Sequence, residues 1–341
     1  MKKLRVALVG MGVRMKDHED VIAKMDDVEV AAFAEIREDR RAEAAARWPE
    51  ARVYNSYAEL IDAESLDTID AIMISVEPTA HGDCELKIVE KGIPFFIEKP
   101  LNIDIETAEK VLVEVEKKGL ITSVGFQDRY LNVMEIIKEE LPKHKSGGLV
   151  YGAWVGGTPK AWWWQKKSTC AGQLVEQSIH LLDGLRWLYG EPLSVYAVAN
   201  QGMQIPGVDA SEEYDTDDHS TVVLRFPGHV TATLVSGCYV KVKPEGYSLR
   251  PRCGFEISLD DMVLDYRLRK NLIITTREEI RDIQAHDGEN TLRCDRAFFD
   301  AVMTGDKSLI RSPYSDGIKT LRLGFAANKS METGEVIYFN K

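Results

Sequence analysis

The residues best suited to chemistry in this sequence are Glu98 and Lys99, which stand directly before Pro100. Gly92 and a proline lead into the apolar run 94–97, which is typical of a buried strand in a parallel sheet. Pro100 ends such a strand because proline has no N–H for the ladder. Lys99 is therefore predicted at the carboxyl end of a strand, where open α/β sheets bind ligands. Its ammonium group can stabilise a developing alkoxide or hold an anion there; the alternative is a solvent-exposed Glu–Lys pair.

A second candidate site lies on a helix predicted over residues 173–188. Glu176, His180 and Asp183 are spaced i, i+4 and i+7, so a single helix places both carboxylates in one stripe with the imidazole. Two carboxylates beside a histidine can hold its tautomer for proton transfer. The same residues admit a metal, but further clustered ligands are lacking, so we predict no metal site. A solvated polar helix face is the alternative.

Alternating strands and helices position the first of these sites. The sequence predicts strands at residues 4–9, 28–34, 52–54, 69–75, 94–97 and 121–125. Helices are predicted between them at residues 13–25, 38–48, 57–61, 79–91 and 105–118. This alternation is typical of an α/β fold with a doubly wound parallel sheet, which we place in a first domain of residues 1–125.

A glycine turn follows the first predicted strand. Gly10 permits a tight turn, Gly12 lets the backbone approach a pyrophosphate, and Val13 opens the next helix, so the segment matches a dinucleotide-binding turn. Met15 stands where that fingerprint has its third glycine. Glu35 comes 25 residues after Gly10 and fits the acidic residue that binds ribose hydroxyls, which favours NAD. Alternatively, Glu35 only caps the helix that follows.

Residues after other strand ends extend the predicted cofactor site. Four of them are expected beside the cofactor: Ile36, Arg37, Pro78 and His81. Arg37 and Arg40 can instead hold the 2′-phosphate of NADP, so NADP remains possible. His81 can also simply begin a helix.

The pattern changes after residue 125, and we assign residues 126–341 to a second domain for substrate binding and oligomerisation. Short strands at residues 149–155, 195–199, 221–226, 230–235, 254–259, 262–265 and 272–276 predict a large, mostly antiparallel sheet, followed by helices at 292–304 and 315–331. Three adjacent tryptophans, Trp162 to Trp164, cannot all enter one core from a regular element. Trp162, Trp163 and Arg129 are therefore candidates for substrate binding, although tryptophan more commonly packs in cores.

Composition narrows the functional classes. A net charge of −12 over 341 residues disfavours nucleic acid and anionic membranes as partners. No apolar run approaches the ~20 residues of a membrane-spanning helix. The five cysteines are scattered without a C-x-x-C pair, which is typical of free thiols in a reducing cytoplasm. The sequence thus indicates a cytoplasmic protein.

Taken together, these motifs resemble the Gfo/Idh/MocA family of oxidoreductases, the glucose–fructose oxidoreductase and inositol dehydrogenase group. The resemblance covers nearly the whole chain. It rests on six segments: Gly10-x-Gly12, Pro78-x-x-His81, Glu98-Lys99-Pro100, residues 172–183 with Glu176 and His180, Ser312-Pro313, and residues 330–334. It implies a Rossmann domain followed by an α/β domain with a large open sheet, often used for oligomer contacts. It also implies NAD(P)-dependent hydride transfer at a sugar or polyol carbinol.

The resemblance carries roles over to individual residues. Lys99 would bond the reacting oxygen and, with Glu98, border the cofactor; His180 would be the acid or base, supported by Glu176. Position 176 is glutamate where many members of the family have aspartate. A homo-oligomer, dimer or tetramer, is the expected assembly. Two alternatives stay open: a glycosidase that uses bound NAD for transient oxidation, and a non-catalytic regulator that senses a nucleotide or sugar.

Overall fold

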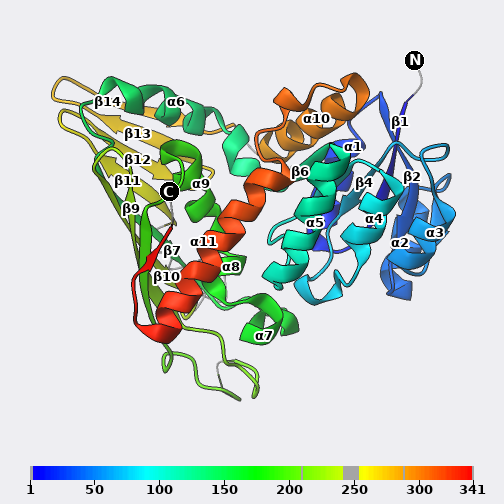
Figure 1. Ribbon diagram of the computed structural model, residues 1–341, viewed down its shortest axis with the longest axis horizontal. Helices are drawn as coiled ribbons and strands as arrows, with labels where there is room; N and C mark the ends of the chain where they lie inside the picture. Colours follow the sequence, from blue (N-terminus) through cyan, green and yellow to red (C-terminus); the bar gives the residue numbers. More distant parts are fainter. Residues whose placement is uncertain (1–2, 209, 241–252, 287–288, 340–341) are drawn as a thin grey trace. The chain divides into compact units, whose positions relative to one another are not determined.

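The computed structural model describes residues 3–208, 210–240, 253–286 and 289–339 (Figure 1). Contacts divide the chain into two compact units. Unit 1 comprises Met1–Gln127 and Glu289–Ile318, and unit 2 comprises Asp128–Gly288 and Lys319–Lys341. The segment 289–318, which the sequence analysis places in the second domain, thus returns to the first unit.

Unit 1 contains a six-stranded parallel sheet in the order β3-β2-β1-β4-β5-β6. The strands are β1 (Leu4–Val9), β2 (Val28–Ala34), β3 (Arg52–Tyr54), β4 (Ala71–Ile74), β5 (Phe95–Ile97) and β6 (Thr122–Val124). The central strands β1, β4 and β5 consist almost wholly of buried apolar residues, as a sheet covered on both faces requires. The predicted parallel, doubly wound sheet is confirmed.

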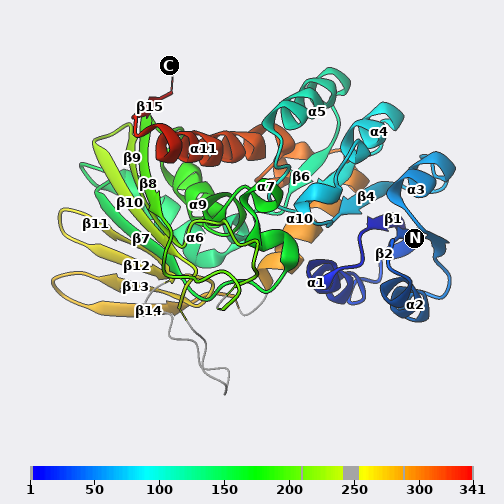
Figure 2. The ribbon, with the colours of Figure 1, turned by 90° about the horizontal axis from the view of Figure 1, so that it is seen from below.

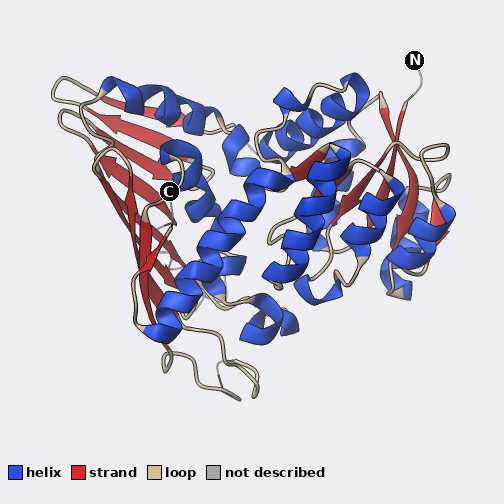
Figure 3. Ribbon diagram, viewed as in Figure 1, coloured by secondary structure: helices blue, strands red, loops and turns tan. Residues whose placement is uncertain are grey.

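Helices cover both faces of this sheet (Figures 2 and 3). They are α1 (Val13–Ile22), α2 (Glu38–Arg47), α3 (Tyr57–Ala63), α4 (Cys84–Lys91), α5 (Ile105–Lys118) and α10 (Glu289–Thr304), with short 3-10 turns η1 (Pro78–Ala80) and η5 (Lys307–Leu309). The predicted helix 79–91 is wrong at its start, because Gly82 adopts a φ of 53° and separates η1 from α4.

The late helix α10 completes the core of unit 1. It packs against α1, and its Phe298 ring meets Phe96 of β5 edge-to-face at 5.9 Å between centroids. Phe298, Phe299 and Cys294 are buried. Helix α10, which is distant in the sequence, therefore covers the face of the sheet on which α1 lies.

Unit 2 is built on a nine-stranded sheet in the order β14-β13-β12-β11-β7-β10-β9-β8-β15 (Figure 2). The strands are β7 (Leu149–Val155), β8 (Ser194–Asn200), β9 (His219–Phe226), β10 (Val230–Gly237), β11 (Cys253–Ser258), β12 (Val263–Arg267), β13 (Asn271–Thr275), β14 (Ile280–Gln284) and β15 (Ile337–Tyr338). Among the pairings of described strands, β10 with β7 is parallel and the others are antiparallel. The predicted mostly antiparallel sheet is confirmed, with β14 and β15 added.

One face of this sheet is covered by α6 (Asn132–Glu140), α9 (Ile179–Tyr189) and α11 (Tyr314–Thr333) (Figures 1 and 2). Leu182 of α9, Met134 of α6 and Leu323 of α11 join the inward residues of the strands in one core. The remaining short elements are η2 (Gln127–Tyr130), η3 (Leu141–Lys143), η4 (Trp162–Gln165), α7 (Lys167–Cys170) and α8 (Gln173–Glu176). None of the helices among residues 3–208, 210–240, 253–286 and 289–339 has both the length and the apolarity to cross a membrane.

The single helix predicted over residues 173–188 is wrong. The chain forms α8 and α9 with a break at Gln177 and Ser178. The Ser178 hydroxyl hydrogen-bonds that of Ser236 on β10 at 2.6 Å, and both side chains are buried. At the break the Ser178 N–H bonds the Gln173 carbonyl oxygen at 3.1 Å, five residues back instead of four, so Glu176 and His180 do not lie on one continuous helix.

Candidate functional site

The glycine turn after β1 is shaped for close approach of a ligand. Gly10 has a φ of 82°, and a Cβ there would lie 2.6 Å from the carbonyl oxygen of Ser75. Gly12 precedes α1 and makes no side-chain cap, so the helix begins with backbone N–H groups that no cap occupies. Val13, the first residue of α1, is exposed. Bare N–H groups at a helix start beside a glycine turn suit the pyrophosphate of a dinucleotide.

Glu35 joins the glycine turn to the start of α2. It is buried, and its carboxylate accepts the backbone N–H groups of Met11 at 2.7 Å and Arg37 at 2.8 Å. Each carboxylate oxygen can accept more than one hydrogen bond, so this placement is compatible with ribose hydroxyls as further donors. Glu35 thus holds the turn in place through its hydrogen bonds and puts a carboxylate beside it.

The residues after Glu35 face the surface. Ile36 is 76% exposed, and the exposed Arg37 pairs with Asp39 at 2.6 Å. Arg40 Nη1 lies 3.6 Å from the position that a Cβ on Gly12 would take. The structure therefore places a guanidinium next to the glycine turn.

The other predicted cofactor residues follow β4. Pro78 begins η1 and is buried, and His81 lies just after it. His81 Nδ1 bonds the buried carboxylate of Glu85, one turn further along. This contact fixes the imidazole within unit 1.

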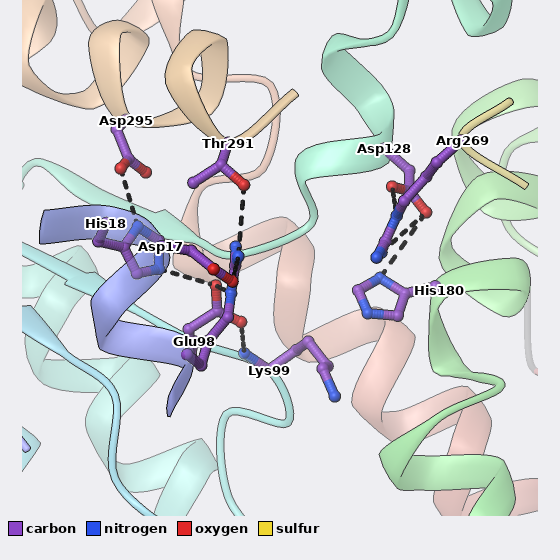
Figure 4. Close-up of polar contacts among 10 residues, drawn as sticks. Asp17, His18, Glu98, Lys99, Asp128, His180, Arg269, Thr291 and Asp295 are labelled. Atoms are coloured by element: carbon purple, nitrogen blue, oxygen red, sulfur yellow. Dashed lines mark hydrogen bonds and ion pairs between the residues drawn. The ribbon is translucent and has the colours of Figure 1, made fainter. Parts of the chain in front are cut away.

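Glu98 and Lys99 emerge from the carboxyl end of β5, as predicted (Figure 4). Glu98 is buried, and its Oε1 accepts hydrogen bonds from Arg14 Nε at 2.8 Å and His18 Nε2 at 3.1 Å. Its Oε2 accepts the backbone N–H of Lys99 at 3.1 Å. Burial alone would raise the pKa of Glu98, but Arg14 and His18 hold it well below its usual range. The Lys99 side chain is partly exposed and extends away from this cluster.

His18 and Asp295 complete the cluster, and sequence reasoning missed both. His18 is buried on α1, and its Nδ1 lies 2.8 Å from Asp295 Oδ2 on α10. Burial alone would lower the pKa of His18, but Asp295 and Glu98 together raise it to about 9. Spacing could not link residues 277 positions apart. The available signal was a histidine on the helix predicted over residues 13–25, which follows the glycine turn.

In unit 2, His180 lies at the start of α9 and is buried. Its ring stacks on Trp154 at 5.9 Å with an interplanar angle of 14°. His180 Nδ1 is 3.9 Å from Asp128 Oδ2, and Asp128 accepts Arg269 Nε at 2.6 Å (Figure 4). The imidazole thus stacks on an aromatic face and lies near a carboxylate at more than hydrogen-bond distance, and histidine is the side chain that most often transfers protons near neutral pH.

The two carboxylates predicted to flank His180 have other partners. Asp183 accepts Arg129 through two bonds of 2.8 and 2.6 Å and also the Thr320 hydroxyl at 2.8 Å. Glu176 Oε2 accepts the indole N–H of Trp164 at 2.7 Å. Spacing along the predicted helix did not point to Asp128 as an acidic neighbour of His180, because Asp128 comes from η2.

Arg129 is 2% exposed and lies 5.1 Å from the Trp187 ring centre, in addition to its pairing with Asp183. The sequence analysis proposed it for substrate binding. Its bidentate ion pair with Asp183 joins η2 to α9 within unit 2.

The three tryptophans differ in exposure along η4. Trp164 is 1% exposed and packs with Tyr214 and Cys238, whereas Trp162 is 62% exposed and Trp163 is partly exposed. The chain therefore anchors η4 through one indole and leaves a second on the surface.

Comparisons with known proteins agree with this architecture. The sequence model of the oxidoreductase family with an NAD-binding Rossmann fold matches residues 4–126, and that of the GFO/IDH/MocA C-terminal domain matches residues 147–258. The chain is similar to myo-inositol 2-dehydrogenase of Thermotoga maritima, with 21% identity over 96% of each chain. It is also similar to scyllo-inositol 2-dehydrogenase (NAD(+)) of Bacillus subtilis, with 24% identity over 78% of this chain and 76% of that protein.

The fold is shared with a solved structure of levoglucosan dehydrogenase in complex with NADH and L-sorbose, at a TM-score of 0.84, 19% identity and full coverage of both chains. Both domain models match in their expected order, and the parallel sheet carries the glycine turn that NAD binding needs. The chain therefore belongs to the Gfo/Idh/MocA family of oxidoreductases, with an NAD-binding Rossmann domain at its N-terminus.

Proposed function

We propose that this protein is an NAD(P)-dependent dehydrogenase or reductase that acts on a carbinol of a sugar, a polyol or a derivative of one. The observation that carries the proposal is Lys99, a partly exposed cation at the carboxyl end of β5 whose backbone is braced by buried Glu98. The names of the inositol and levoglucosan dehydrogenases among its relatives support the substrate class. Unit 1 would bind the nucleotide and unit 2 the substrate.

The proposed chemistry divides between two side chains. In oxidation, His180 accepts the hydroxyl proton of the substrate, and the C–H electron pair leaves as hydride while the C–O bond becomes a carbonyl. Lys99 stabilises the negative charge that develops on the oxygen. When bound, the nicotinamide supplies the hydride acceptor, or the donor in the reverse direction. Glu176, fixed by Trp164, is proposed to support this pair.

For the cofactor we propose NAD, because the Glu35 carboxylate beside the glycine turn repels a 2′-phosphate. Arg40 near Gly12 and the exposed Arg37 keep NADP possible. For the substrate site, the exposed indole of Trp162 and the partly exposed Trp163 offer apolar faces for sugar C–H groups. We also propose that the protein is cytoplasmic, because its cysteines are free thiols, and that it forms a homo-oligomer through its large sheet.

The test begins with NADH and NADPH titrations, followed by energy transfer from tryptophan to the nicotinamide. A panel of sugars and polyols read by nicotinamide absorbance then gives turnover. Lys99→Ala and His180→Ala should each lower turnover by roughly 10²-fold or more. Lys117→Ala, which alters an exposed lysine on α5, is the control and should leave turnover unchanged.

Near-wild-type turnover in either variant removes that residue from the mechanism. Sugar release without net change in absorbance would point to transient-oxidation glycosidase chemistry instead. A folded, nucleotide-free protein that binds neither NADH nor NADPH would contradict the proposed function altogether.

A further inference from the structure

We propose that His18 is a positioning residue for Lys99 and that it acts through the carboxylate of Glu98, with Asp295 as its counter-ion. The inference rests on the proposed function, because it concerns the residue to which we assign charge stabilisation. The residues involved lie on α1, at the end of β5 and on α10, all of which belong to unit 1.

The contacts run from His18 to Lys99 without a gap. His18 Nε2 lies 3.1 Å from Glu98 Oε1, and the other oxygen of the same carboxylate accepts the Lys99 backbone N–H at 3.1 Å. The orientation of the carboxylate therefore determines whether this hydrogen bond to the Lys99 backbone N–H forms. His18 and Arg14 share one oxygen of Glu98, so together they set that orientation.

Packing leaves Glu98 little room to turn. A Cβ on Gly125 would lie 2.6 Å from both Oε1 and Cδ of Glu98, so the carboxylate rests directly against backbone that follows β6. On the other side, the Phe96 ring meets His18 edge-to-face at 5.2 Å. His18, Glu98 and Asp295 are all buried, and water therefore has little access to replace a lost partner.

The cluster is balanced in charge when His18 is protonated. Arg14 and His18 are its cations, and Glu98 and Asp295 are the buried anions; Arg14 also pairs with the exposed Asp17 at 2.9 Å. Lys99 is the further charge that acts on Glu98 from the β5 end. The raised pKa of His18, about 9, means that its proton is present at neutral pH.

Loss of that proton changes the forces on Glu98. A neutral side chain at position 18 leaves the two buried carboxylates to be compensated by Arg14 and, from the β5 end, by Lys99. The repulsion between the carboxylates then favours rotation of Glu98. The Lys99 N–H then loses its acceptor, and the ammonium group shifts with the backbone. A displacement near 1 Å at a reacting group lowers turnover by roughly 10- to 100-fold.

The test compares three variants of the full chain. His18→Gln keeps polarity without charge, and His18→Gln combined with Asp295→Asn removes one charge of each sign. Glu19→Gln is the matched control, since Glu19 is the neighbouring buried residue on α1 and bonds Trp48 instead of Glu98. Hydrogen exchange of the Lys99 amide, resolved by fragmentation mass spectrometry, reports directly on the bond to Glu98.

We expect His18→Gln to raise the exchange rate of the Lys99 amide at least 10-fold and to lower kcat while Kd for NADH changes less than threefold. The double variant should recover most of the protection, and Glu19→Gln should match the wild type. In the wild type, protection should fall as pH rises through about 9, after correction for intrinsic exchange. That pH dependence should be absent in His18→Gln.

Unchanged Lys99 exchange in a folded His18→Gln protein would overturn the proposal, as would equal losses in the double variant. Because exchange is read without turnover, its result is independent of the proposed function. The protein could be inactive on every substrate while the Lys99 amide still responds to the change at His18. That result would support the positioning network and contradict the proposed dehydrogenase activity.

Discussion

Arg129 offers a direct test between a structural role and a role in substrate binding. The variant Arg129→Met keeps an apolar side chain of similar length and removes the guanidinium. It breaks the two bonds of 2.8 and 2.6 Å to Asp183 and leaves that carboxylate buried. Removing one partner of a buried ion pair costs about 3–5 kcal/mol, so the free energy of unfolding should fall by about that amount.

Tryptophan fluorescence during urea unfolding is suited to this measurement, because Trp154, Trp162–Trp164 and Trp187 all lie in unit 2. A loss of 3–5 kcal/mol corresponds to a melting temperature lowered by about 6–20 °C for a domain of this size. Combining Arg129→Met with Asp183→Leu should restore much of the loss, since no buried charge is left unpaired. Arg267→Met, on the exposed part of β12, should change stability by less than about 0.5 kcal/mol.

A structural role for Arg129 is refuted if the free energy of unfolding of Arg129→Met lies within about 1 kcal/mol of the wild-type value and the KM for the substrate rises tenfold instead. That result would return Arg129 to the substrate site, where the sequence analysis placed it. The side chain's 2% exposure would then have to change when substrate binds.

Three further predictions concern other parts of the two units. Gly10→Ala should weaken NADH binding at least tenfold in the energy-transfer titration, because a φ of 82° and a Cβ 2.6 Å from the Ser75 carbonyl oxygen force the turn to move; unchanged affinity would contradict the assigned turn. Trp164→Phe should lower the free energy of unfolding by about 1–3 kcal/mol in urea, since it leaves the Glu176 carboxylate without its indole donor. His18 has a folded pKa of about 9, above its ordinary value, so its contribution to stability is full below about pH 6.5 and is lost as pH rises through about 9. The loss should be on the order of 3 kcal/mol in denaturation at a series of pH values, and His18→Gln should not show it.

The sequence was sufficient for the elements whose signals are local. Strands β1, β2 and β3 were predicted with their full bounds, because apolar runs and turn residues occur together at their ends. Lys99 was placed at a strand end by the same reasoning. Nothing beyond neighbouring residues is needed for such a prediction.

Features fixed by distant contacts were not predictable in this way. The break between α8 and α9 lies where the Ser178 hydroxyl bonds that of Ser236, and a helical pattern read along the chain does not contain that contact. The pairing of His18 with Asp295 needs α10 to return to unit 1. Strand β14 lacks an apolar alternation because most of its side chains are exposed. In each case tertiary structure overrides the local pattern.

The discontinuity of unit 1 has a consequence for synthesis on the ribosome. The first 127 residues emerge with all six strands of the parallel sheet, but Phe298 and Phe299 are made much later. Until then Phe96 and the buried face of α1 lack their cover, and His18 and Glu98 lack the Asp295 carboxylate. The nascent Rossmann domain is therefore an intermediate with exposed apolar side chains. It cannot be completed until the intervening sheet domain and then α10 have been synthesised. A fragment that ends at residue 127 should accordingly aggregate and be poorly soluble. Joining residues 289–318 to it through a linker should restore its solubility.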